Sequence, residues 1–218
     1  MFRNPLLFGA RCGMYSVSVF LCWATYYRLG NDFNSIQDRQ GCVAFMSIML
    51  MFNAVTATLI PFMYYKPVFE REFSTGLYGS MSVYMSNSLI YLPLDIMFGF
   101  VEWCIIYWTV GMNPLIDNFF KALWIMLLMG ATGNSLGVFI AVVSPSIEFA
   151  IEFATAFVLP MIAWGGIFLN IEDIPEWLPW KWLSPIRFSF EAMIRNEYDN
   201  LNSMSSDLSD AAVDHLNL

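Results

Sequence analysis

The chain has 218 residues, of which 58% are hydrophobic and only 13% charged, and its formal net charge is −8. A soluble domain carries about a quarter charged residues, so this chain has too few polar groups to cover a water-exposed surface. The acidic balance argues against nucleic acid as a partner, because no basic face exists to neutralise phosphates. Composition therefore predicts an all-α, polytopic bundle of membrane helices.

Five apolar segments are candidates to cross hydrocarbon about 30 Å thick, which needs roughly 20 helical residues. In chain order, the predicted spans are about 10–29, 42–65, 81–112, 121–143 and 149–170. The first reaches spanning length only if Arg11 or Arg28 extends its charged end to an interface. A signal peptide is the alternative for this segment, but the bulky residues Trp23, Tyr26 and Tyr27 stand where small residues should mark cleavage, which favours a retained helix.

Short connections are predicted between these spans. They comprise residues 31–41, 66–79 and 111–121, and a tight turn at 144–146. Residues 164–182 are rich in Trp and Pro, a composition typical of a membrane–water interface. The last residues are polar and acidic, which predicts a disordered tail. The chain is thus divided into a membrane domain, 1–198, and a tail, 199–218.

Two acidic residues fall within the predicted third span. Asp95 and Glu102 are seven residues apart, which places them on one face of a helix. Acids inside a membrane cost several kcal/mol and normally face protein or water. They could line a polar path or relay protons. Alternatively, either pairs with a neighbouring polar group, or Glu102 lies near an interface, and this alternative is favoured.

The predicted fourth span contains a GxxxG spacing at Gly133 and Gly137, which lets helix backbones approach closely. Packing within the bundle is slightly favoured over a homodimer seam. Three prolines, Pro61, Pro93 and Pro160, interrupt apolar helices and permit kinks. The four cysteines lie in or beside apolar stretches and are interpreted as small core residues.

Residues for catalysis are scarce. A P-loop requires Gly-Lys-Ser/Thr, and none of the three lysines, Lys66, Lys121 and Lys181, follows a glycine. The single histidine, His215, lies in the polar tail, so a histidine-based metal site or a Ser–His dyad inside the membrane is not predicted. An enzyme acting alone is not expected, and neither a metal nor a cofactor is predicted in this chain.

Four segments form an ordered set of motifs: NSIQDRQG at 34–41, KPVFEREFSTGLY at 66–78, Leu92-Pro93, and the Trp- and Pro-rich stretch at 165–198. As a set they resemble the transmembrane domain of G-subfamily ABC transporters, the white and pleiotropic drug resistance type. The resemblance covers the chain up to about Tyr198. It implies most of a six-helix ABC-2-like membrane domain, of which five helices are predicted here, followed by re-entrant external helices.

The resemblance also implies a set of functional residues. Family members are dimers whose second and fifth spans face a central substrate cavity. By this likeness the cavity residues are Met49, Phe52, Thr155, Leu159 and Ile162; composition alone would make them core or lipid-facing. An apolar plug would consist of Ile167 and Phe168. A coupling segment, which passes motion from the ATPase to the membrane helices, would include Lys66, Glu70, Arg71 and Glu72.

The function implied is the substrate-translocating part of an ATP-driven exporter of hydrophobic compounds, such as lipids, sterols or xenobiotics. Its expected partners are a nucleotide-binding domain that binds ATP and Mg outside this chain, a second half-transporter, membrane lipid, and a hydrophobic small-molecule substrate. The expected location is multi-pass in the plasma membrane, with an intracellular membrane as the alternative.

Departures from the family pattern give a second hypothesis. The chain contains neither the nucleotide-binding domain nor a sixth apolar span, and Tyr65 and Tyr91 stand where acidic residues are common in the family. No cysteine follows Cys104, so the external-loop disulfides of some relatives cannot form. The alternative function is therefore a truncated, non-transporting membrane protein, or a fragment, that pairs with full-length relatives and modulates them.

Overall fold

The structure is a computed structural model that describes residues 5–27, 33–76, 78–112, 115–166 and 180–198. Within these residues the secondary structure is helical and contains no strand. The helices are α1 (Pro5–Thr25), α2 (Phe33–Ser74), α3 (Ser80–Val110), α4 (Ile116–Val143), α5 (Ile147–Ala163), α6 (Trp180–Leu183) and α7 (Pro185–Tyr198). An all-helical bundle satisfies its backbone hydrogen bonds internally, as lipid requires.

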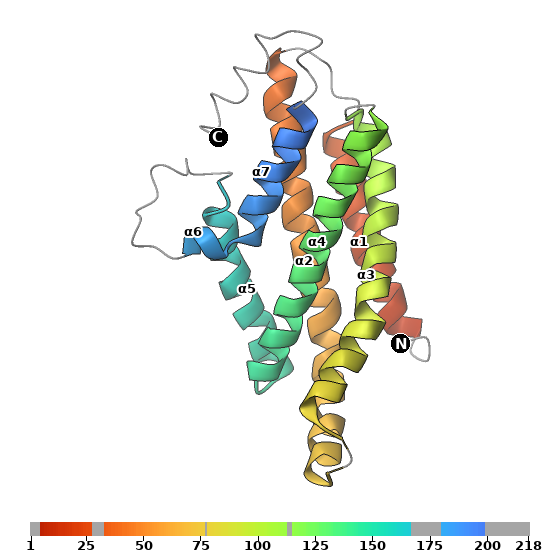
Figure 1. The fold of residues 1–218 in the computed structure, drawn as a ribbon, viewed down its shortest axis with the longest axis vertical. Coiled ribbons are helices and arrows are strands. Elements are labelled where there is room, and N and C mark those ends of the chain that lie inside the picture. Colours follow the sequence, from red (N-terminus) through yellow and green to blue (C-terminus); the bar gives the residue numbers. More distant parts are fainter. Residues whose placement is uncertain (1–4, 28–32, 77, 113–114, 167–179, 199–218) are drawn as a thin grey trace.

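The first four helices alternate in direction, so that α1 and α3 run one way and α2 and α4 the other (Figure 1). Helix α2 is the centre of the bundle and packs against α1, α3, α4, α5 and α7. Its fully buried side chains include Met51 and Leu59, which join Trp103 of α3 and Ile140 of α4 in one apolar core.

Three of the described helices are long and apolar enough to cross a membrane: α2, α3 and α4. The other two predicted spans, 10–29 and 149–170, correspond to α1 and α5, which are not among these three helices. Helix α5 has 17 residues, because its backbone turns at Trp164, whose N–H bonds back to Pro160 and Ile162. Gly166 then takes a positive φ of 77°, a conformation that glycine adopts without steric cost. Beyond it, residues 167–170 of the predicted fifth span lie outside the described residues.

Helix α2 is longer than its predicted span of 42–65 at both ends, since it begins at Phe33 and continues to Ser74. Most of the two loops predicted at 31–41 and 66–79 is therefore helical, which corrects that expectation. Pro67 lies within the helix without ending it, and the Glu and Arg residues that follow are good helix formers. The chain turns only at Gly76, where φ is 72°. The ends of α2 and α3 form a hairpin that projects beyond the other helices (Figure 1).

Helices α2 and α4 approach each other at the predicted GxxxG motif. A Cβ atom added to Gly133 would lie 2.8 Å from the Cβ of Ala54, and one added to Gly137 would lie 2.6 Å from the carbonyl oxygen of Val55. Only glycine allows this approach, because real Cβ contacts are longer. The interpretation of these glycines as packing within the bundle is confirmed.

Helix α7 is fastened to the end of the bundle where α2 begins. Arg39 of α2 forms an ion pair with Glu197, with 2.5 Å between Nη1 and Oε1. The Asn196 side chain donates to the backbone oxygen of Asn118 at the start of α4, at 2.8 Å. At the other end of α7, the Ser184 hydroxyl donates to the carbonyl of Met161 at 2.7 Å. These contacts hold α7 against α2, α4 and α5.

Candidate functional site

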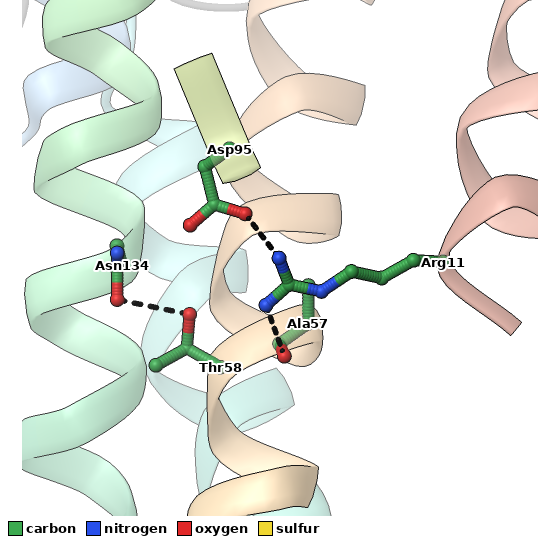
Figure 2. A network of polar contacts seen from close by, with 5 residues as sticks. All are labelled: Arg11, Ala57, Thr58, Asp95 and Asn134. Atoms are coloured by element: carbon green, nitrogen blue, oxygen red, sulfur yellow. Dashed lines mark hydrogen bonds and ion pairs between the residues drawn. The ribbon is translucent and has the colours of Figure 1, made fainter. Parts of the chain in front are cut away.

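An arginine is buried in the interior of the bundle. Arg11 of α1 is 4% exposed, and its Nη1 lies 2.9 Å from Oδ1 of Asp95 on α3. Its Nη2 donates to the carbonyl of Ala57 on α2 at 2.7 Å, and its guanidinium lies over the ring of Tyr91 (Figure 2 shows the polar contacts). The sequence predicts that Arg11 or Arg28 reaches an interface, and Arg28 lies outside the described residues. Arg11 does not, because a buried carboxylate and a carbonyl satisfy its charge inside the bundle.

The second acid of α3 is paired in the same way. The Ser18 hydroxyl donates to Glu102, and the Asn53 side chain of α2 donates to Ser18 at 3.3 Å. Arg11 and Ser18 are seven residues apart on α1, as Asp95 and Glu102 are on α3, and these two helices run in the same direction. The interpretation that each acid pairs with a neighbouring polar group is therefore confirmed. The matching spacing of seven is the sequence signal that could have revealed both partners.

The residues predicted to border a substrate cavity lie on α2 and α5, and two of the five are on sides that the bundle does not cover. Phe52 is 42% exposed and Leu159 is 58% exposed. Met49, Thr155 and Ile162 are partly buried. The cavity beside Asp95, which lies between α2, α3 and α4, has none of these five residues in its wall. Their assignment to a substrate cavity stays a prediction.

The predicted apolar plug, Ile167 and Phe168, lies outside the described residues. The predicted coupling segment lies within the described residues, and its members differ in exposure and in contacts. Glu70 and Arg71 are exposed on the last turns of α2. The Tyr78 hydroxyl donates to Glu72, and the hydroxyls of Tyr78 and Tyr65 lie 3.1 Å apart. These two hydrogen bonds, that to Glu72 first, raise the pKa of Tyr78 above its ordinary value. Tyr65 thus joins the hairpin network by its hydroxyl.

Lys66 has a structural contact that sequence reasoning missed. Its ammonium group donates to the carbonyl oxygens of Val142 at 2.9 Å and Ser144 at 2.6 Å, and lies 3.3 Å from that of Ala141. These carbonyls end α4, where a lysine satisfies unpaired acceptors and the helix dipole. Lys66 therefore ties the base of the α2–α3 hairpin to the turn between α4 and α5. No sequence pattern links positions so far apart.

The hydrogen bond between Thr58 and Asn134 was also missed. Thr58 Oγ1 donates to Asn134 Oδ1 at 2.9 Å across the α2–α4 interface, next to Gly133 (Figure 2). The available sequence signal was a threonine and an asparagine within two apolar segments, since polar groups in a membrane interior need partners. Among the described residues, no cluster of three His, Cys, Asp or Glu side chains suits a metal ion.

Comparison with known proteins gives one consistent result. Residues 1–198 match the family model of the ABC-2 type transporter membrane domain. ABC transporter G family member 1 of Dictyostelium discoideum is 27% identical over 212 residues, which cover 94% of this chain and 26% of that protein. ABC transporter G family member 18 of Arabidopsis thaliana is 27% identical and covers 91% of the chain. The broad substrate specificity ATP-binding cassette transporter ABCG2 of Sus scrofa is 26% identical over 80% of it. The chain spans about a quarter of the length of these relatives.

Proposed function

Because the chain belongs to the ABC-2 type transporter family, with homologues among its G-type members, we propose that it is the substrate-translocating membrane domain of an ATP-driven exporter of hydrophobic compounds. The observation that carries this proposal is the match over residues 1–198, which spans every described helix of the bundle. ATP and Mg would be bound and hydrolysed in a nucleotide-binding domain outside these residues.

The uncovered apolar sides of α2 and α5 support a hydrophobic cargo. Phe52 and Leu159 present large apolar side chains that this chain alone leaves exposed. In a dimer, the same sides of two copies or of two related halves would face each other and enclose a cavity. An aromatic wall suits flat apolar molecules such as sterols and drugs. The partner half and the cargo are parts of the proposal.

Coupling to the ATPase is proposed to run through the α2–α3 hairpin. Glu70 and Arg71 are exposed on the part of α2 that projects beyond the bundle, which is where a second domain can reach them. Lys66 joins this hairpin to the α4–α5 turn, so a push on the hairpin would also move the start of α5. Through that link, movement at the hairpin would reach both helices that bear the proposed cavity residues.

A paired substitution tests the cavity in the complete native polypeptide, reconstituted in lipid vesicles and tested with a panel of lipids, sterols and drugs. Phe52→Ala removes an aromatic face worth about 0.5–1.5 kcal/mol, so the apparent affinity for a transported compound should fall by roughly 2- to 10-fold. Phe100→Ala is the matched control, because Phe100 is 45% exposed but lies on α3. Equal effects of the two substitutions would remove Phe52 from the cavity, and no ATP-dependent movement of any compound would contradict the proposed function.

The coupling segment is tested in the same preparation. Replacing Glu70 and Arg71 together by glutamine should lower substrate-stimulated ATPase activity while leaving cargo binding unchanged, because both side chains are exposed on the hairpin and away from α5. An unchanged ATPase activity would exclude them as coupling contacts. If the native polypeptide hydrolyses no ATP and co-purifies with a full-length G-type relative, the alternative function as a modulating partner would replace the proposal.

A further inference from the structure

One oxygen of the buried carboxylate on α3 lacks a protein partner. Oδ1 of Asp95 pairs with Arg11, but Oδ2 is buried and accepts no hydrogen bond from the residues that the structure describes. Asp95 as a whole is only 6% exposed. In Figure 2 the second oxygen points away from Arg11 and toward the side where α4 is drawn. A buried carboxylate oxygen with no donor is costly in free energy, so something is expected to bond to it.

A small cavity adjoins this carboxylate. It lies between α2, α3 and α4, and Asp95 forms part of its wall together with Leu50 and Ile96. Two glycines and an alanine, Gly99, Gly130 and Ala131, leave the space open. A Cβ atom added to Gly130 would meet nothing within 4 Å, so this glycine, unlike Gly133 and Gly137, is not required for helix contact.

The size of the cavity limits what can occupy it. Its volume is about 10 Å³, which is roughly the space that one water molecule needs. The hydroxyl end of a lipid or sterol would bring carbon atoms for which there is no room. A divalent cation would need about six oxygen ligands, whereas the named wall residues other than Asp95 carry apolar side chains or none. Water fits by size, and it donates a hydrogen bond to a carboxylate, which is the one polar side chain in the wall.

We propose that this cavity is a binding site for one water molecule, which donates a hydrogen bond to Oδ2 of Asp95. The carboxylate is then held on both sides, by the Arg11 guanidinium from α1 and by water from the direction of α4. The water replaces a side-chain contact at the Gly130 position, where α3 and α4 would otherwise have a void. This inference concerns the interior of the bundle and does not depend on whether the protein transports a substrate.

X-ray radiolysis footprinting tests the site directly in the complete native polypeptide in lipid nanodiscs. Brief irradiation converts bound water to hydroxyl radicals, which oxidise the nearest side chains, and methionine is readily oxidised to its sulfoxide. Met126 is in the cavity wall and is 2% exposed, whereas Met161 is equally buried but is not in that wall. We expect Met126 to be oxidised several-fold faster than Met161. Equal rates in the unmodified protein would overturn the proposal.

Two substitutions at one position provide the second test. Gly130→Ser places a hydroxyl in the cavity that displaces the water and can bond to Asp95 in its place. Gly130→Ala displaces the water without replacing the hydrogen bond. In both variants Met126 oxidation should fall to the rate of Met161, and the thermal unfolding temperature should be lower for Gly130→Ala than for Gly130→Ser. Rapid oxidation of Met126 in both variants, or equal unfolding temperatures, would contradict the water site.

Discussion

The α1–α3 and α2–α4 interfaces hold the same bundle together by different physics. Between α1 and α3, ring contacts to Phe98 are joined by two buried polar contacts, of Asp95 with Arg11 and of Glu102 with Ser18. Between α2 and α4 the contact is steric, because Gly133 and Gly137 let two backbones meet more closely than any side chain allows. The polar interface depends on the pairing of Arg11 with Asp95 and of Ser18 with Glu102, whereas the steric interface depends on the absence of side-chain atoms at two glycines.

This difference matters because the two kinds of interface respond oppositely to substitution. Apolar contact gives little selectivity between membrane helices, since lipid tails are as apolar as leucine. A buried ion pair adds selectivity, but loss of one partner leaves an unpaired charge. A glycine seam has no charge to expose and is disrupted only by added volume. Substitutions that remove a group should therefore damage α1–α3 most, and substitutions that add one should damage α2–α4.

The largest expected effect comes from removing one half of the ion pair. Arg11→Met should lower the free energy of unfolding by about 3 kcal/mol, because it leaves Asp95 charged and unpaired in the membrane interior. The double variant Arg11→Met with Asp95→Leu should regain most of that loss, since no charge then remains. Chemical unfolding of the purified protein in detergent micelles measures both. A double variant no more stable than Arg11→Met would mean that the pair does not set the stability of this interface.

Added volume should have the next largest effect. Gly137→Ala forces a Cβ atom to within 2.6 Å of the Val55 carbonyl oxygen unless the helices separate, so the free energy of unfolding should fall by about 2 kcal/mol. Gly13→Ala on α1 is the control, because a Cβ atom there meets nothing within 4 Å; it should be neutral or slightly stabilising. The same unfolding assay applies, and equal effects of the two alanines would show that α2 and α4 do not pack through Gly137.

Several features of this bundle could be predicted from sequence because they depend on local pattern. Long apolar runs indicate α2, α3 and α4, a spacing of seven places Asp95 and Glu102 on one face, and the GxxxG spacing indicates a close helix contact. The missed features depend on tertiary structure. The sequence places Lys66 in a charged segment, and only the fold brings it to the end of α4. In the sequence, Arg11 is one of two arginines that could reach an interface, and only the fold places it beside the carboxylate of Asp95.

The ends of the helices also could not be predicted from the sequence pattern. The predicted span of 42–65 stops before Lys66, because hydropathy falls there, but a helix can continue past the apolar run. Helix α2 does so through Pro67 and ends near Gly76. The assignment of the substrate-cavity residues stays a prediction for a different reason: it rests on the family resemblance and not on a contact within the bundle.

A smaller effect is expected at the hydrogen bond between Thr58 and Asn134, which crosses the steric interface beside the glycine seam. Thr58→Val removes the hydroxyl that donates to Asn134 and keeps the side-chain shape. The average value of such bonds in membranes is about 0.6 kcal/mol, so the free energy of unfolding should fall by roughly that amount. Thr56→Val is a matched control, because the Thr56 hydroxyl bonds to Phe52 within its own helix. If both valine variants lose the same stability, the interhelical hydrogen bond contributes nothing to the glycine seam.

The smallest effect is expected at the hairpin, where a polar contact lies outside the membrane spans and can be titrated without unfolding the bundle. The Tyr78 hydroxyl donates to Glu72, and this bond raises the pKa of Tyr78 above its ordinary value of 10.0. Because the folded hairpin favours the protonated phenol, the contact is fully present below pH 10 and is lost as the pH rises through the raised pKa.

Tyrosinate absorption as a function of pH measures this pKa, and subtracting the titration of Tyr78→Phe isolates the Tyr78 contribution. Glu72→Gln should return the Tyr78 pKa toward 10.0, since the amide is a weaker acceptor without charge. Glu70→Gln, two residues earlier on the exposed side, should leave it nearly unchanged. A Tyr78 pKa that responds equally to both substitutions would mean that general acidity of the hairpin, rather than the Glu72 contact, raises it. Specific polar pairing would then be a property of the α1–α3 interface and not of the hairpin.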